Sequence, residues 1–156
     1  MNPVNAATRV IADLLADDRW AIAHGFQDGC PRILRYRDAI SQELGRSEHQ
    51  HLVLIRWSYP EAEGKEGLPS TTSLDEMSQF EDALLAAVER PLADVLVSAV
   101  TGQGQRIWAL YVRSPTAFSE KFGDVHAPGD GYPIEVGIWM DPDWGYFFNE
   151  ILGAID

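Results

Sequence analysis

The stretch from His51 to Arg90 constrains the fold of this chain more than any other part of it. Its first nine residues, HLVLIRWSY, are rich in the β-branched and aromatic residues typical of a strand, which Pro60 then ends. A glycine-containing loop follows, and then a segment with apolar residues at helical spacing. Ser73 and Glu76 form a capping-box pattern, which predicts the start of this helix. A buried strand that leads into an amphipathic helix indicates a sheet with helices packed on it.

The predicted helix carries a charged residue, Glu81, on its inward stripe. A carboxyl group in that position is either a general acid with a raised pKa or one member of an ion pair. We favour an ion pair with an arginine from a neighbouring strand, with Arg35, Arg37 and Arg56 as the candidates. The apolar members of the stripe are Leu74, Met77, Leu84, Leu85 and Val88.

The rest of the chain alternates between strand and helix patterns. The predicted elements are a helix at 5–16, a hairpin at 20–26 and 31–37, a second hairpin at 94–101 and 105–113, a short helix after Ser114, a strand at 132–140 and a helix after Asp141. From His51 onward the order is strand, helix, strand, strand, helix, strand. This order predicts an α+β fold: a ferredoxin-like split βαβ sheet, mainly antiparallel, extended by the N-terminal hairpin and with helices packed on it.

We expect a single domain over 1–156, with an N-terminal helix in 1–18, a core in 20–144 and a C-terminal helix in 141–156. Strand phase predicts which side chains lie under the helices. That set is Val53, Ile55, Trp57 and Tyr59; Val95, Val97 and Ala99; Ile107, Ala109 and Tyr111; and Ile134, Val136, Ile138 and Met140. The opposite, mixed face is expected to carry Arg56, Arg106, Trp108, Glu135 and Trp139. A terminal helix, a second subunit or a ligand would partly cover it, and we favour the N-terminal helix or hairpin as the cover.

The charge of the chain excludes some partners and favours others. A formal net charge of −12 and a pI near 4.6 argue against a nucleic-acid surface, which needs clustered basic residues. The same charge favours a protein partner with a basic surface. No apolar run approaches membrane-spanning length, and the first twenty residues do not resemble a signal peptide, so we expect a cytoplasmic protein. Cys30 is the only cysteine, which excludes an internal disulfide and a thiolate-rich metal site.

Three catalytic or ligand patterns are incomplete. His49 and His51 form an H-x-H pair without a third ligand, so a solvated loop pair is favoured over a metal site. Lys65 follows a glycine but lacks the remaining residues of a P-loop, and glutamates surround it. No neighbouring group in the sequence is suited to activate Cys30 as a nucleophile. We therefore expect no cofactor, no metal and no catalytic residue.

Four segments together resemble a known family. They are WSYPEAEGKEGLPS, SLDEMSQFEDAL, VTGQGQRIWALYV and GYPIEVGIWMDPDW, and the resemblance covers most of 20–144. The family is DUF695, a bacterial domain named for its lack of a known function. Some of its members resemble fusions to a domain similar to the protein inhibitor of ribonuclease E. The resemblance implies a regulatory or binding role and supplies no catalytic residue.

Two functional hypotheses follow. The first is a non-enzymatic acidic module that binds a protein partner, or a second copy of itself through an exposed sheet face or edge. The second is a small enzyme or ligand-binding domain whose pocket contains Arg56, Glu81, Glu135 and nearby tryptophans. The residues that we expect to make contacts are Arg56, Glu81, Arg106, Trp108, Glu135 and Trp139.

Overall fold

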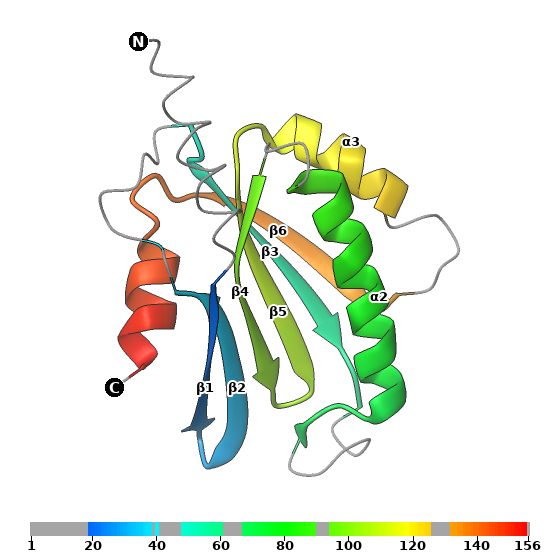
Figure 1. Cartoon of the computed structure of the whole chain (residues 1–156), viewed down its shortest axis with the longest axis vertical. Coiled ribbons are helices and arrows are strands. Elements are labelled where there is room, and N and C mark those ends of the chain that lie inside the picture. Colours follow the sequence, from blue (N-terminus) through cyan, green and yellow to red (C-terminus); the bar gives the residue numbers. More distant parts are fainter. Residues whose placement is uncertain are drawn as a thin grey trace.

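The chain folds as an α+β protein built on one open sheet (Figure 1). The computed structural model describes residues 19–38, 40, 48–60, 67–89, 94–125 and 132–155. The strands are β1 (Trp20–Gln27), β2 (Cys30–Arg37), β3 (His51–Ser58), β4 (Asp94–Gly102), β5 (Gln105–Val112) and β6 (Ile134–Met140). All neighbours are antiparallel, in the order β1-β2-β4-β5-β3-β6. The helices are α2 (Thr71–Val88), α3 (Pro115–Val125), the π-helical η2 (Tyr146–Ile151) and the short 3₁₀ helix η3 (Leu152–Ala154).

Both predicted hairpins are confirmed. β1 and β2 are joined by Asp28 (φ 53°) and Gly29 (φ 79°), and β4 and β5 by Gln103 (φ 53°) and Gly104 (φ 81°). Two successive positive φ angles are those of a type I′ turn, whose twist matches that of the flanking strands. The predicted helix at 5–16 lies outside the described residues.

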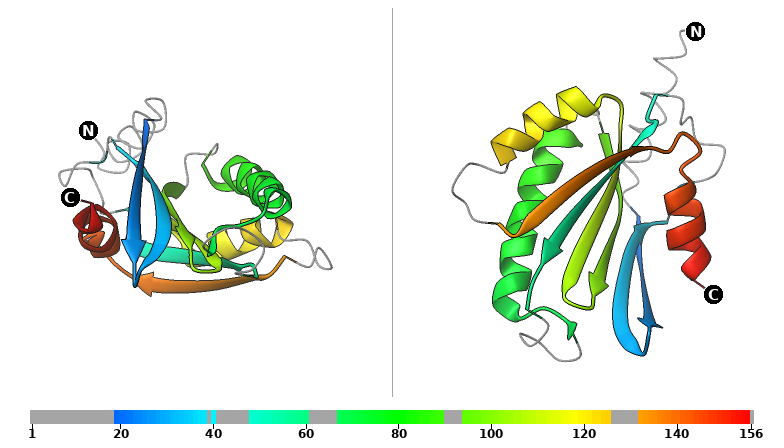
Figure 2. Two further views of the ribbon diagram at one scale, coloured as in Figure 1. Left: turned by 90° about the horizontal axis from the view of Figure 1, so that it is seen from below. Right: turned by 180° about the vertical axis from the view of Figure 1, so that it is seen from behind.

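The helices α2 and α3 lie on one face of the sheet and the C-terminal helical segment on the other (Figure 2). Each face carries its own apolar core. On the first, which we call the α2 face, α2 and α3 cover side chains of β3, β4 and β5. On the second, the η2 face, Trp144, Phe147 and Ile151 of the C-terminal segment cover Leu52 and Tyr111. The C-terminal segment therefore covers part of the face for which we expected the N-terminal helix or hairpin as the cover.

The strand phases were predicted correctly for β3 but not for β4 and β5. Trp108 and its alternate neighbours in β5 lie on the α2 face, whereas Ala109 and Tyr111 lie on the η2 face. Since β5 is buried on both faces, both of its phases are apolar, and alternation could not decide between them. In β4 a bulge between Leu96 and Ser98 reverses the phase, so Val95 and Ala99 lie on opposite faces.

β6 also departs from the prediction. Ile134 packs against the core on the α2 face, but Val136, Ile138 and Met140 are 41%, 37% and 61% exposed. β6 is the last strand of the sheet, and α2 and α3 do not cover these three side chains. An edge strand with the composition of a core strand is the least expected feature of the fold.

α2 begins earlier than predicted and with a different cap. The N-cap is Ser70, whose Oγ accepts a hydrogen bond from the amide of Ser73 at 3.1 Å. Ser73 thus lies inside the helix, and its predicted role as the cap is wrong. The buried residues of α2 are Met77, Phe80, Leu84 and Val88, whereas Leu74 is 38% exposed.

We expect the substitution Ser70→Ala to lower the free energy of unfolding by about 1 kcal/mol, because it leaves a first-turn amide of α2 without its side-chain acceptor. Urea unfolding monitored by circular dichroism measures this difference. Ser78→Ala is the matched control, since Ser78 is exposed in the middle of the same helix. Equal losses for the two variants would contradict the capping role of Ser70.

Candidate functional site

A polar cluster lies between α2 and the sheet, centred on Glu81. Its carboxylate oxygen Oε1 pairs with the guanidinium of Arg35 on β2 and accepts a hydrogen bond from the indole Nε1 of Trp108 at 2.7 Å. Arg106 lies over the Trp108 ring, and its Nε donates to Thr101 Oγ1 at 2.7 Å. Burial lowers the pKa of Arg106, the nearby charge of Arg35 lowers it further, and Glu81 partly offsets both effects. The predicted ion pair of Glu81 is confirmed, with Arg35 as the partner.

A second charged pair ties the end of α2 to the sheet. Arg37 is 2% exposed; its Nη2 donates to Glu89 Oε2 at 2.7 Å and its Nε to the carbonyl of Leu96 at 2.9 Å. The amide of Leu96 donates to the same glutamate oxygen at 2.8 Å. These bonds satisfy the backbone where the bulge interrupts the β4–β5 ladder. The role of Glu89 could not be predicted from the sequence, because nothing in the chain's periodicity distinguishes it from a solvent-exposed residue at the end of a helix.

The contacts of the Glu81 cluster hold α2 against the sheet and indicate a role in stabilising the fold. Its carboxylate is held by an arginine and an indole, on the opposite side of the sheet from Arg56 and Glu135. The predicted single pocket containing Arg56, Glu81 and Glu135 is therefore wrong. The predicted placement of Arg106 and Trp108 on the same face as Arg56 is also wrong, because the side chains of β5 alternate in the opposite phase to the one predicted.

The remaining three predicted residues, Arg56, Glu135 and Trp139, do lie together. They are on the η2 face, in a part of it that η2 does not cover. Arg56 on β3 pairs in register with Glu135 on β6, and Arg56 Nη1 lies 3.9 Å from Glu135 Oε2. Trp139 lies two pairs further along β6, opposite Leu52. We call this uncovered part of the η2 face the open face; it comprises Arg32, Leu54, Arg56, Gln105, Ile107, Glu135, Gly137 and Trp139, with Tyr146 and Glu150 of η2 at its margin.

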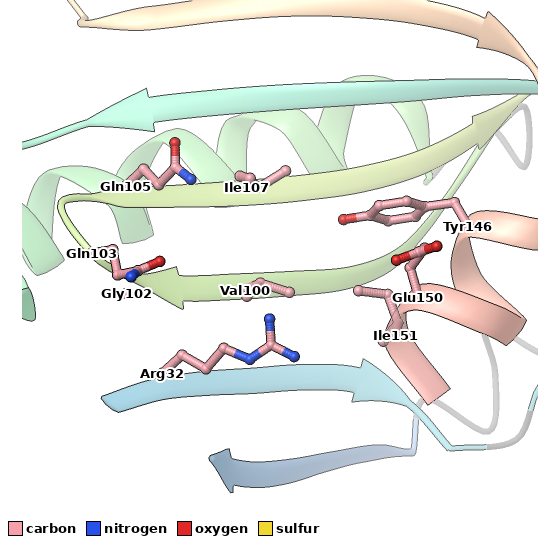
Figure 3. Close-up of a pocket in the computed structure, with 9 residues that line it drawn as sticks. All are labelled: Arg32, Val100, Gly102, Gln103, Gln105, Ile107, Tyr146, Glu150 and Ile151. Carbon is pink, nitrogen blue, oxygen red and sulfur yellow. The ribbon is translucent and has the colours of Figure 1, made fainter. Parts of the chain in front are cut away.

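Two hollows lie side by side on the open face. The first, about 210 Å³ in volume, is bounded by β2, the β4–β5 hairpin and η2 (Figure 3). The second, about 240 Å³, lies between β3 and β6 under Trp139. They lie on neighbouring strands, because Arg56 of the second pairs in register with Ile107 of the first. Both hollows therefore belong to the same part of the sheet.

Side chains of opposite charge line the first hollow. In Figure 3, Arg32 extends from β2 toward the hollow, and Tyr146 and Glu150 extend toward it from η2. Burial and the charge of Glu150 raise the pKa of Tyr146, whereas Arg32 and Arg56 lower it. Because the net shift is upward, the Tyr146 hydroxyl stays protonated at neutral pH and can donate a hydrogen bond. Arg32, Tyr146 and Glu150 were missed, since no sequence pattern shows which strand η2 lies beside.

Trp139 is held in place by its own strand. Its ring lies over Gly137, where a Cβ atom would approach the ring to 2.2 Å. Glycine at this position thus creates the space that the indole fills, and the ring remains 53% exposed. An exposed aromatic ring with a fixed orientation loses little conformational entropy when a partner covers it.

Two further titratable residues, His49 and Asp94, are buried. His49 is fully buried, and its carbonyl accepts a hydrogen bond from Trp144 Nε1 at 2.8 Å, so the prediction of a solvated loop pair is wrong for this residue. Within the described ranges, no group of three or more His, Cys, Asp or Glu residues is arranged to hold a metal ion. Asp94 is 3% exposed at the start of β4, and burial raises its pKa to about 6.

The fold and the site define an α+β protein with an antiparallel six-stranded open sheet and an uncovered, aromatic- and arginine-bearing sheet face. The chain belongs to DUF695, a family of unknown function, whose model matches residues 18–152. The match confirms the resemblance and extends it through η2. Comparisons with curated proteins and with solved structures find no match. In the described part of the chain, no helix is both long enough and apolar enough to cross a membrane.

Proposed function

We propose that this chain is a non-enzymatic binding or regulatory module that contacts a protein partner through the open face. The observation that carries the proposal is the exposed Trp139 ring, fixed over Gly137 and close to Arg56. Tryptophan and arginine are enriched among the residues that dominate binding energies at protein interfaces. The indole buries a large area around two rotatable bonds, and the planar guanidinium both stacks and donates several hydrogen bonds. The Glu81 cluster, by contrast, contributes to the fold.

The charge around the open face supports a partner with a basic surface. The Glu135 side chain is 84% exposed and Glu150 is exposed at the margin of η2, in a chain whose net charge is −12. Acidic side chains at the rim of an interface raise the association rate with a basic partner and make it sensitive to salt. Arg56 and Arg32, which lie nearer the centre, then contribute to specificity.

We also propose that β3, α2, β4, β5, α3 and β6 form a ferredoxin-like split βαβ unit that the β1–β2 hairpin extends. The strand order β4-β5-β3-β6 supports this, as does the packing of α2 and α3 in one core on the same face. In this arrangement the face opposite the two helices is uncovered unless a further element is added. Here η2 covers only part of that face, which leaves the open face.

A comparative pull-down tests the proposed function. Immobilised wild-type protein is expected to retain a partner from a lysate of its source organism at low salt. Trp139→Ala and Glu135→Lys should each reduce recovery of that partner about tenfold. Phe26→Ala is the matched control, because Phe26 is an exposed aromatic residue on β1, outside the open face. Repeated low-salt experiments that recover no partner, or a partner lost equally with Phe26→Ala, would overturn the proposal.

The first hollow favours a second candidate function, the binding of a small ligand. The convergence of Arg32, Tyr146 and Glu150 suits a small molecule that carries both an anionic group and a hydrogen-bond donor. Under this alternative, Arg32→Ala should abolish binding of the small molecule, while Trp139→Ala leaves it unchanged. Mass spectrometry of the native protein, purified without denaturant, would reveal such a ligand.

A further inference from the structure

The outer edge of β6 exposes backbone groups in a defined pattern. β6 is the last strand of the sheet, and among the described residues only β3 pairs with it. The amide of Ser58 donates to the carbonyl of Pro133 at 3.0 Å, and the amide of Asp141 donates to the carbonyl of Gln50 at 2.8 Å. Because the direction of backbone groups alternates along an antiparallel strand, the groups of 135, 137 and 139 also face β3. Those of Val136, Ile138 and Met140 face outward.

The same three residues carry exposed apolar side chains on the α2 face of β6, and the fourth exposed apolar residue, Trp139, lies on the opposite face. Natural sheets protect a free edge with lysine, proline, a bulge or an inward charge. β6 reads IEVGIWM, and its only charged residue, Glu135, lies beside Arg56. Val136, Ile138 and Met140 thus have both outward-facing backbone groups and exposed apolar side chains. An unprotected edge of this kind can pair with a further β-strand.

We propose that this strand is β6 of a second copy of the chain, so that two molecules pair edge to edge in a continuous antiparallel sheet. A pairing that overlaps all seven residues has its twofold axis at Gly137. In that register Val136 lies opposite Ile138 of the second copy, and Ile134 opposite its Met140. Each outward-facing residue of β6 therefore meets an apolar residue, which is the self-complementarity that an isologous interface requires.

The proposed register keeps like charges apart even though each chain carries −12. In the proposed register Glu135 of one copy lies opposite Trp139 of the other and not opposite its Glu135, so like charges do not meet directly. Each Glu135 keeps its Arg56 on the inner side. The two open faces join on one side of the extended sheet, so the dimer presents its binding surface twice. The pairing itself does not depend on the proposed function.

Proline scanning of the edge tests this pairing. Ile138→Pro removes an amide that faces outward and that the β3–β6 ladder does not use, so the fold is retained while edge pairing is lost. Ile138→Lys is the second variant, which tests the same position without a backbone change. The matched control is Ile22→Lys on β1, the opposite edge of the sheet, where Ile22 is 62% exposed.

Sedimentation velocity over a concentration series gives the outcome, with circular dichroism to show that each variant is folded. Wild type and Ile22→Lys are expected to show a dimer of 17.4 kDa chains. Both Ile138 variants should weaken it at least about 100-fold. A wild-type chain that stays monomeric at the highest concentration, a dimer that survives Ile138→Lys, or one that Ile22→Lys disrupts equally would overturn the proposal. A wild-type chain that forms the dimer but retains no basic partner would count against the proposed function alone.

Discussion

Replacement of Glu81 by alanine is expected to lower the free energy of unfolding by about 3 kcal/mol. The Glu81 carboxylate is the acceptor for both Arg35 and the Trp108 indole, and its charge also acts on the partly buried Arg106. Its removal leaves a guanidinium and a buried N–H group without their acceptor. The loss of these compensating bonds, more than the intrinsic strength of the pair, sets the size of the effect.

Two further variants separate the contributions at this site. Glu81→Gln retains an acceptor for Trp108 but removes the charge, so its loss should be clearly smaller than that of Glu81→Ala. Asp82→Ala, the adjacent exposed position of α2, should change stability by no more than about 0.5 kcal/mol. Urea unfolding of the three variants gives the comparison. A Glu81→Ala variant as stable as Asp82→Ala would show that the cluster contributes nothing to the fold.

Glu81 also shows what the sequence reveals about a site. A carboxylate on an apolar stripe predicted an ion pair with a strand arginine, and Arg35 was among the three candidates. The identity of the partner depended on which strand lies beneath the helix, and local periodicity does not contain strand order. The same limit applies to Trp108, whose indole completes the cluster. Both phases of β5 are apolar, so its face was determined only by the packing of the whole sheet.

The open face was predictable in part. Arg56, Glu135 and Trp139 share a face because β3 and β6 are neighbours in register, and alternation along each strand was sufficient to group them. Arg32 and Tyr146 could not be added from sequence, because their proximity depends on where η2 packs. The helix start that the sequence predicts at Asp141 is wrong, because the N-cap of η2 is Gly145. Asp141 lies before it and accepts hydrogen bonds from the amides of Gly145 at 2.9 Å and Tyr146 at 3.0 Å. The position of η2 on the sheet is fixed by the stacking of Trp144 on Tyr111, with ring centroids 4.2 Å apart.

Local sequence also failed to predict the exposure of β6. Ile134, Val136, Ile138 and Met140 have the alternation of a strand that is buried on one face, and that pattern is the same whether a helix of the same chain or a second subunit provides the cover. The number of helices on the α2 face and the position of β6 at the end of the sheet decide the matter. The strand whose apolar residues are unexpectedly exposed, β6, is also the strand that carries the surfaces we propose for binding.

Asp94 is expected to make the stability of the protein fall as the pH rises from about 4 to above 6. Burial raises the pKa of its carboxyl group from 3.8 in the unfolded chain to about 6, and the hydrogen bond from the Arg113 amide, with the charges of Lys121 and Arg113, only partly opposes this. The folded protein thus binds the proton more tightly than the unfolded chain does. The resulting stabilisation is fully present below about pH 3.8 and is lost as the pH passes through about 6.

The size of this effect follows from the shift. About two pKa units correspond to about 3 kcal/mol, which the folded protein forgoes at neutral pH by holding an ionised carboxylate in a buried position. Asp94→Asn cannot ionise, and its side-chain oxygen still accepts from the Arg113 amide. The difference in unfolding free energy between Asp94→Asn and wild type should therefore be near zero at pH 4 and reach about 2 to 3 kcal/mol in favour of the variant above pH 7.

Urea unfolding at a series of pH values measures that difference directly, and the titration of other carboxyl groups cancels because both proteins share them. Asp82→Asn is the control, since Asp82 is exposed and its variant should follow the wild-type curve at every pH. Parallel curves for Asp94→Asn and wild type would show that the pKa of Asp94 is not raised. A difference in unfolding free energy that grows as the pH falls would show that the Arg113 amide and the neighbouring positive charges outweigh burial. The ionised Asp94 carboxylate would then stabilise the fold.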